Sequence, residues 1–305
     1  MTPSIIDVHV HLCRTARQEA VVFPRPGLPD EWRWANGDAC GEYMTRNGVE
    51  AIVGLNYMVV PQMFEQQRAR RPETSDDQLW DMLRERVRDF NSWTLSQQAQ
   101  DARIRTFLCC DIGTWRETDL LMEELERGIE AGARGVKMHP GLGRFFPADE
   151  RMLPLYARME EAGLPILSDT GSLRGGPGED VYGMPDHFIP VFERFPRLQF
   201  IMAHMPGAYW DQRIDIARRF PQVIFDTAGG FDDGHFPCRD GRRACALEDA
   251  ARLIRKLGVE RVLFGSDAPG ADQRPQVLQI LRSGLTDTEI EAVLSGNARP
   301  VLGLS

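Results

Sequence analysis

The histidines of this sequence are the residues most able to do chemistry. His9 and His11 lie two residues apart at the end of the apolar stretch SIIDVHV. If that stretch is a β-strand, its side chains alternate between two faces, so Asp7, His9 and His11 should share one face. Two imidazoles about 7 Å apart along a strand can bind one metal ion where the strand twists. Taken alone, such a pair is more often two histidines satisfied by hydrogen bonds than a metal site.

Ionisable residues also end other short apolar stretches of the chain. They are Lys137 and His139 in 134–139, Asp169 in 165–170, His204 in 199–204, Asp226 in 223–228 and Asp267 in 261–267. Four of the six histidines lie at such ends. Burying so many ionisable groups together is costly unless they bind an ion or one another. A metal site is the simplest explanation of the whole set.

Eight short apolar stretches are expected to be strands that alternate with helices. Their ranges are 4–10, 50–56, 105–112, 134–139, 165–170, 199–204, 223–228 and 261–267. Such crossovers make the strands parallel, and strands buried on both faces are apolar throughout. We therefore predict an α/β fold, a (β/α)8 TIM barrel over residues 1–305, with its active site at the C-terminal ends of the strands. A doubly wound open sheet is the alternative, but no glycine-rich phosphate-binding motif follows the first strand.

Apolar residues at helical spacing predict the helices between these strands. In the stretch 74–100, for example, Leu79, Leu83 and Val87 recur every four residues. Thr286 begins the last expected helix, where its hydroxyl can serve as the N-cap. The expected ranges are 74–100, 118–131, 149–162, 207–219, 247–257, 273–283 and 286–294.

The composition excludes several classes of protein. A net charge of −9 argues against a surface that binds nucleic acid or an anionic membrane. The sequence has no apolar run of about 18 residues, so no transmembrane helix is expected. The N-terminus lacks the pattern of a signal peptide, and we expect a cytoplasmic protein. The six cysteines form no CxxC motif and are expected to be buried thiols.

Three long connections follow predicted strands, over residues 12–37, 171–186 and 229–244. Long loops on the rim of a barrel commonly shape a substrate pocket, although they can also be surface decoration. We expect them to determine which small molecule is bound.

The motifs IDVHVHL, GVKMHP, FIMAHMPG and LFGSDAPG, in this order, resemble the amidohydrolase superfamily. They are most similar to its amidohydrolase-related branch, which includes aminocarboxymuconate-semialdehyde decarboxylase. The resemblance extends to GNARPVLGL near the C-terminus. It implies one divalent metal ion, most often zinc, bound by His9, His11 and Asp267, with His204 beside the bound water or substrate. It also makes a homodimer the default expectation.

One position departs from the pattern of the family. Where the family usually has a histidine in a motif like IHTG, this chain has Ser168, Asp169 and Thr170 before a glycine. A carboxylate can replace imidazole as a zinc ligand and would improve tolerance for manganese or iron. We predict that Asp169 is a metal ligand. The alternatives are a partner that orients His9 or His11, or a cap of the following loop.

Other residues have less definite roles. Lys137 could hold a substrate carboxylate, or be carboxylated to bridge two metal ions as in some relatives. His139 should point the same way as Lys137 and line the pocket. Asp226 could line the pocket or be structural, and Asp7 is expected to be structural. Arg174, in the loop after the fifth strand, is a candidate for anion binding, although most arginines are simply exposed.

These observations predict a metal-dependent hydrolase of a small polar lactone, amide or ester. Metal-bound water would attack the substrate, with Asp267 and His204 as catalytic residues. The alternative is a non-oxidative decarboxylase or hydratase of an aromatic or muconate-type acid, which would use the same site. A third hypothesis is a catalytically silent binding barrel. A fold by itself does not distinguish these, because one barrel hosts many chemistries.

Overall fold

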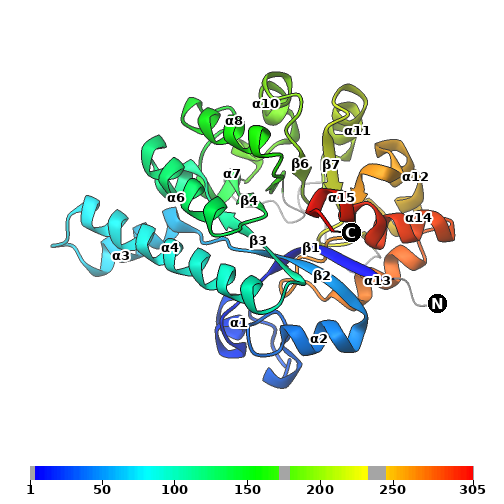
Figure 1. The fold of residues 1–305 in the computed structure, drawn as a ribbon, viewed down its shortest axis with the longest axis horizontal. Helices are drawn as coiled ribbons and strands as arrows, with labels where there is room; N and C mark the ends of the chain where they lie inside the picture. Colours follow the sequence, from blue (N-terminus) through cyan, green and yellow to red (C-terminus); the bar gives the residue numbers. More distant parts are fainter. Residues whose placement is uncertain (1–3, 172–178, 233–244, 305) are drawn as a thin grey trace.

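The structure is a computed structural model that describes residues 4–171, 179–232 and 245–304. Eight parallel strands form one sheet in the order β1 to β8, surrounded by helices (Figure 1). The strands are β1 (Ile5–His11), β2 (Val49–Leu55), β3 (Ile104–Cys109), β4 (Gly135–Met138), β5 (Ile166–Ser168), β6 (Phe200–Met202), β7 (Val223–Asp226) and β8 (Val262–Leu263). Each coincides with a predicted strand, although most are shorter at their ends.

Backbone hydrogen bonds between β1 and the end of β8 close the sheet into a barrel. The amide of Val8 donates to the carbonyl of Phe264 at 2.9 Å, and that of His11 donates to Ala268 at 2.7 Å. The amide of Asp267 donates to the carbonyl of His9 at 2.9 Å. The predicted (β/α)8 barrel is therefore confirmed, and two segments expected to bind metal are neighbours at the seam.

The predicted helices are present, and further helices lie in the connections. The helices are α1 (Ala16–Val22), α2 (Cys40–Asn47), α3 (Val60–Arg70), α4 (Asp76–Gln100), α5 (Ile112–Trp115), α6 (Thr118–Glu130), α7 (Pro140–Gly143), α8 (Leu153–Ala162), α9 (Glu179–Tyr182), α10 (Ile189–Arg194), α11 (Trp210–Arg219), α12 (Ala250–Leu257), α13 (Gln273–Leu281), α14 (Asp287–Glu291) and α15 (Ala298–Leu302). Thr286 caps α14 through the amide of Glu289, as predicted, and a π-helical turn over Ala292–Gly296 follows. The connection 12–37 contains α1 and is therefore not a plain loop.

The hydrophobic core has an outer layer and an inner layer. The outer layer lies between the sheet and the surrounding helices. The inner layer fills the barrel, and its fully buried members come from several strands and from α15. They are Ile6, Val8, Ala51, Val53, Leu55, Phe107, Leu167, Ile201, Ala203, Leu263, Ala298 and Leu302. The apolar filling makes the interior a packed core, so chemistry must take place at the rim.

The facing of side chains along β1 differs from the prediction. The pairing of β1 with β2 shifts by one residue between Asp7 and Val10, as in a β-bulge. The carboxylate of Asp7 accepts a hydrogen bond from Gln273 Nε2 in α13 at 2.6 Å, whereas His9 contacts Asp226 of β7. The expectation that Asp7 shares a face with His9 and His11 is therefore wrong, because the extra residue reverses the alternation.

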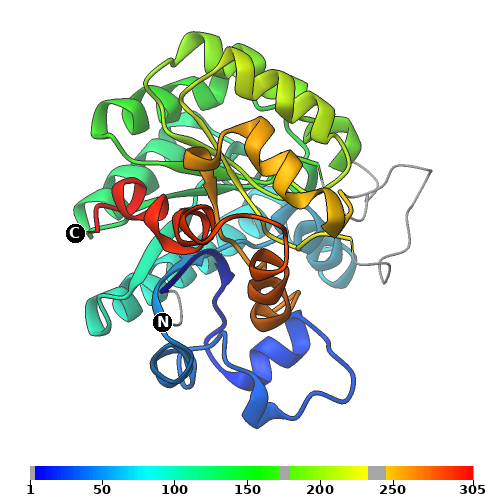
Figure 2. The same ribbon diagram turned by 90° about the vertical axis from the view of Figure 1, so that its right-hand side faces the viewer.

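The segment after β1 packs against α13, far away in the sequence (Figure 2). Tyr43 of α2 donates from its hydroxyl to Gln273 at 3.1 Å, and Arg274 donates to Asn47 at 2.7 Å.

In the described part of the chain, no helix is long and apolar enough to span a membrane. The five described cysteines are buried free thiols, as expected.

Candidate active site

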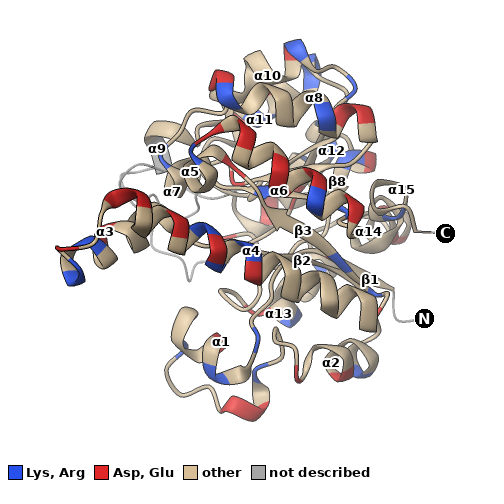
Figure 3. Cartoon of the chain, turned by 60° about the vertical axis from the view of Figure 1, so that its left-hand side comes forward, with Lys and Arg blue, Asp and Glu red and all other residues tan. Residues whose placement is uncertain are grey.

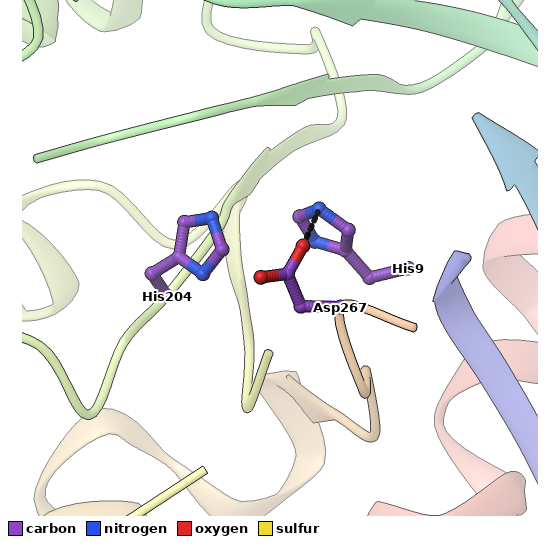
Figure 4. A group of neighbouring side chains, drawn as sticks. All are labelled: His9, His204 and Asp267. Carbon is purple, nitrogen blue, oxygen red and sulfur yellow. Dashed lines mark ion pairs between the residues drawn. The ribbon is translucent and has the colours of Figure 1, made fainter. Parts of the chain in front are cut away.

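Three ionisable side chains meet at the carboxyl ends of β1, β6 and β8. His9, His204 and Asp267 each offer one ligand atom, and these atoms lie within 4.8 Å of one another. Figure 4 shows the Asp267 carboxylate between the two imidazoles. His9 Nε2 is 3.6 Å from Asp267 Oδ1, and His11 Nε2 is 3.2 Å from the same oxygen. The structure thus brings four of the five residues with predicted metal or catalytic roles together at the mouth of the barrel.

Neighbouring groups determine the orientation of the His9 ring. Its Nδ1 lies 2.8 Å from Asp226 Oδ2, so this nitrogen carries the proton and donates. Its Nε2 lies 3.4 Å from the amine of Lys137, which donates to the remaining lone pair. Burial lowers the pKa of His9 well below its usual value, so the ring is neutral. A neutral imidazole held by a carboxylate behind it is the usual arrangement of a metal-ligating histidine.

The carboxylate of Asp169 lies between two other histidines. Its Oδ2 is 3.0 Å from His204 Nε2 and 3.2 Å from His139 Nε2. His139 Nδ1 accepts from the amide of Leu142 at 3.3 Å, so its Nε2 carries the proton and donates to Asp169. His139 and Asp169 thus face the same rim as Lys137, as predicted. Asp169 does not belong to the group formed by His9, His204 and Asp267. Its role as a metal ligand stays a prediction.

His204 has hydrogen-bond acceptors at both ring nitrogens. Its Nδ1 lies 3.1 Å from the carbonyl of Ala228, and its Nε2 faces Asp169. Burial opposes the charged ring, but the hydrogen bond and charge of Asp169 outweigh it and raise the pKa of His204 to about 9. Although burial acts against the Asp169 carboxylate as well, His139 and His204 hold the pKa of that group well below its usual range. His204 and Asp169 therefore form a buried ion pair at neutral pH.

Two of the site residues have a backbone conformation that residues other than glycine rarely adopt. His204 has a φ of 61° and Asp267 a φ of 63°. Such left-handed positions cost about 1 kcal/mol or more for a residue with a Cβ atom, and they gather at functional sites. Gly265 allows His9 and Asp226 to pack closely beside it, because a Cβ there would lie 2.9 Å from the Cβ of His9. This local geometry supports a functional role for both residues.

Asp226 and Lys137 are buried within the cluster. Asp226 Oδ1 accepts from the amides of His204 at 2.9 Å and Ala228 at 3.0 Å, while Oδ2 faces His9. These contacts are those of a group that positions the two histidines, and a direct contact with substrate stays a prediction. Burial lowers the pKa of Lys137, while nearby carboxylates act in the opposite direction. Arg174 lies outside the described residues.

Three further residues at this rim were not singled out from the sequence. Asp111 accepts from the amide of His139 at 3.3 Å and caps α5 through the amide of Thr114 at 3.0 Å. The rings of Phe23 and Tyr57 lie 5.6 Å from His11 and 5.0 Å from His139. Asp111 was detectable as a further carboxylate near the end of a strand. The two aromatic residues follow the first and second strands without any recognisable motif.

The side chains present fit a divalent cation. Three buried or half-buried carboxylates, Asp169, Asp226 and Asp267, face two cations, the ammonium of Lys137 and the charged ring of His204. Such an excess of negative charge in a low-dielectric site is stabilised by a bound cation. Imidazole and carboxylate ligands suit zinc, manganese and iron alike. The possible ligand atoms on one side of the cluster belong to His9, His11 and Asp267.

The chain belongs to the amidohydrolase family. The sequence profile of that family, described as Amidohydrolase, matches residues 6–304. This match confirms the resemblance found in the motifs and makes the protein an enzyme of the amidohydrolase superfamily. A search among curated proteins finds no match to this chain.

Several solved structures share the fold. An uncharacterised TIM-barrel protein from Bordetella bronchiseptica is 19% identical with a TM-score of 0.70, and the match covers 98% of each chain. A dihydroxybenzoic acid decarboxylase from Polaromonas, with bound manganese and the inhibitor 2-nitroresorcinol, is 15% identical with a TM-score of 0.69, covering 99% of this chain and 97% of the other. A 5-carboxyvanillate decarboxylase from Sphingomonas paucimobilis is 17% identical with a TM-score of 0.67, covering 100% of both chains. At such low identity these likenesses establish the fold alone.

Proposed function

We propose that this enzyme is a metal-dependent, non-oxidative decarboxylase of an aromatic carboxylic acid. The observation that carries the proposal is the buried ammonium of Lys137, which lies 3.4 Å from His9 Nε2 among the histidines and aspartates of the site. An ammonium beside a bound cation is suited to hold a carboxylate. The rings of Phe23 and Tyr57 at two edges of the cluster suit a planar aromatic substrate. Similar folds named as aromatic-acid decarboxylases support the same choice.

His9, His11 and Asp267 would hold the metal ion, with Asp169 as a further predicted donor. When bound, a divalent ion polarises the substrate oxygens that it contacts. Zinc is the expected ion, with manganese or iron as alternatives. Asp226 would orient His9 for this task through the 2.8 Å contact to Nδ1.

The remaining residues would move one proton. In the reaction the bond between the ring carbon and the carboxylate breaks, carbon dioxide leaves, and the electron pair stays on the ring carbon. His204, which has acceptors at both ring nitrogens, would donate its Nε2 proton to that carbon. Asp169 accepts from this Nε2 at 3.0 Å, so that hydrogen bond would break as the proton is transferred. The carbonyl of Ala228, 3.1 Å from Nδ1, would hold the ring in position meanwhile.

A hydrolase remains the second candidate, and Asp267 favours it. Its side chain is 30% exposed, compared with complete burial of His9, so it is the more open of these two groups. A carboxylate at this place could take the proton from a metal-activated water in attack on a lactone, amide or ester. The homodimer expected from the family and a cytoplasmic location also stay proposals.

The decisive experiment offers the metal-loaded protein two sets of substrates. Hydroxybenzoic acids labelled with carbon-13 at the carboxylate should release labelled carbon dioxide, and His204→Gln should lower the rate strongly. Uptake of oxygen-18 from solvent into a lactone or ester product, without release from any acid, would favour the hydrolase. Stoichiometric metal without turnover of either set would point to a silent binding barrel.

A further inference from the structure

A pocket lies among α3, α5 and α7, separate from the cluster of His9, His11, His139, Asp169, His204 and Asp267, here called the His/Asp cluster. Figure 3 shows these helices next to one another on the side of the barrel where the connections after β2, β3 and β4 gather. The pocket has a volume of about 370 Å³. Its charged lining consists of Arg116, Arg144, Arg151 and one acid, Glu65. In a chain of net charge −9, a cavity with three cations and one anion indicates an anionic ligand.

Two of these arginines have an unusual backbone conformation. Arg116 ends α5 with a φ of 63°, and Arg144 ends α7 with a φ of 58°. Glycine is the usual residue at a left-handed helix end, because a Cβ atom there costs about 1 kcal/mol or more. Only five non-glycine residues in the described part of the chain have such a φ, and two of them line this pocket. Two residues of this pocket thus carry a long cationic side chain at positions where glycine would cost less.

Arg116 has a charge available for a ligand. Its guanidinium carbon lies 4.5 Å from the centre of the Trp80 ring, and Trp80 stacks on Phe64 with the ring centres also 4.5 Å apart. Stacking covers one face of a guanidinium and leaves its N–H groups free in the plane. Among the residues that the structure describes, no acid pairs with Arg116. Arg144, in contrast, bonds to Glu65 at 2.5 Å.

The third arginine is held next to Arg116. Arg151 donates through Nη1 to the carbonyl of Arg116 at 3.1 Å, and it pairs with Asp149 at 2.6 Å. Two glycines bring the two helix ends together, since a Cβ on Gly113 would lie 2.5 Å from the carbonyl oxygen of Gly143. A side chain at Gly113 would push α5 and α7 apart. The close approach therefore places the guanidinium groups around one cavity.

We propose that this pocket is a second binding site, for a small molecule that carries a carboxylate or phosphate group. Arg116 would pair with the anionic oxygens, while Arg144 and Arg151 add positive charge at the rim. The half-buried ring of Phe64 would contact the rest of the ligand. The proposal does not depend on the reaction catalysed at the His/Asp cluster, because the pocket shares no lining residue with it.

The test is titration calorimetry of the metal-free, full-length chain with inorganic phosphate and with benzoate, at constant ionic strength. We expect saturable binding of at least one probe with a dissociation constant in the millimolar range or tighter. Arg116→Gln should weaken it at least about tenfold. Arg46→Gln, a matched loss of charge in an exposed residue paired with Glu42, should leave it unchanged. Preference for phosphate would indicate a phosphoryl ligand, and preference for benzoate an aromatic carboxylate.

Equal affinities in the wild type and the Arg116→Gln variant would overturn the proposal, as would the absence of saturable binding of both probes. If the probes bound only at the His/Asp cluster, the wild type and the Arg116→Gln variant would have equal affinities, because the substitution leaves that cluster intact. Circular dichroism checks the fold of each variant. If Arg116→Gln does not fold, Arg144→Gln takes its place, with an expected loss of affinity of about threefold, because Arg144 adds charge at the rim and already pairs with Glu65.

Discussion

The mouth of the barrel has two halves that use similar residues differently. In the half formed by β8 and β1, the nitrogens of His9 and His11 face one oxygen of Asp267 at 3.6 and 3.2 Å. In the half formed by β4 to β6, one oxygen of Asp169 accepts from His139 and His204 at 3.2 and 3.0 Å. Both halves consist of two histidines and one aspartate.

The difference lies in where the protons are. His9 has its proton on the nitrogen that faces Asp226, so the lone pair of its Nε2, which accepts from Lys137 at 3.4 Å, can bind a cation in place of that contact. His139 and His204 direct protonated nitrogens at Asp169 and are already satisfied by it. The comparison indicates that the β8–β1 half is suited to bind a metal ion and the β4–β6 half to hold and move protons.

The largest effect is expected from Asp267→Asn, in the β8–β1 half. Loss of the carboxylate removes a metal donor, so we expect loss of bound divalent metal and a fall in kcat/KM of about 10⁴-fold. Elemental analysis and steady-state kinetics measure the two effects. Asp215→Asn, at an exposed position of α11, is the matched control and should change neither. Full metal content in Asp267→Asn would contradict the assignment of this half.

Asp169→Asn tests the other half directly. The contacts of Asp169 predict that metal content stays at the wild-type level while kcat falls about 10²-fold to 10³-fold, because the paired histidines lose their common acceptor. Loss of the metal in this variant would instead confirm the ligand role predicted from the sequence. Metal content per folded protein therefore decides between the two roles of Asp169.

Asp226→Asn should have an intermediate effect through His9. Removing a carboxylate that orients a metal-binding histidine weakens metal affinity by about 10-fold to 100-fold. Competition with a chromophoric chelator measures this affinity. An unchanged affinity would show that the ring of His9 does not depend on Asp226 for its orientation.

The smallest effect concerns stability and Asp111, which supports the β4–β6 half. Burial raises the pKa of Asp111 from 3.8 to about 6, so the folded state binds its proton more tightly than the unfolded state. This contribution to stability is present at low pH and is lost as pH rises through the folded pKa. The free energy of unfolding, relative to Asp111→Asn, should fall by about 1.5 kcal/mol between about pH 4.5 and 6. Urea denaturation of the metal-free proteins measures it, and the opposite slope would contradict the prediction.

Much of the site was predictable because parallel strands all end at one rim. His9, His11, His139, His204 and Asp267 each end a recognisable apolar stretch, and the barrel brings such ends together. Phe23 and Tyr57 were not predictable, since they lie in connections whose course depends on the packing of the helices. The structural role expected for Asp7 agrees with its contacts to Gln273 and Ser266.

The sequence by itself determined the number and order of the strands, the closed barrel and the residues at its mouth. These features depend on local periodicity and on chain direction, which a single sequence records. The tertiary structure alone decided the partner of each ionisable group. The register shift in β1 turned Asp7 away from His9, and the positions of neighbouring strands directed Asp169 to His139 and His204. Such pairings depend on register between strands distant in sequence, where a change of one residue reverses the facing of a side chain.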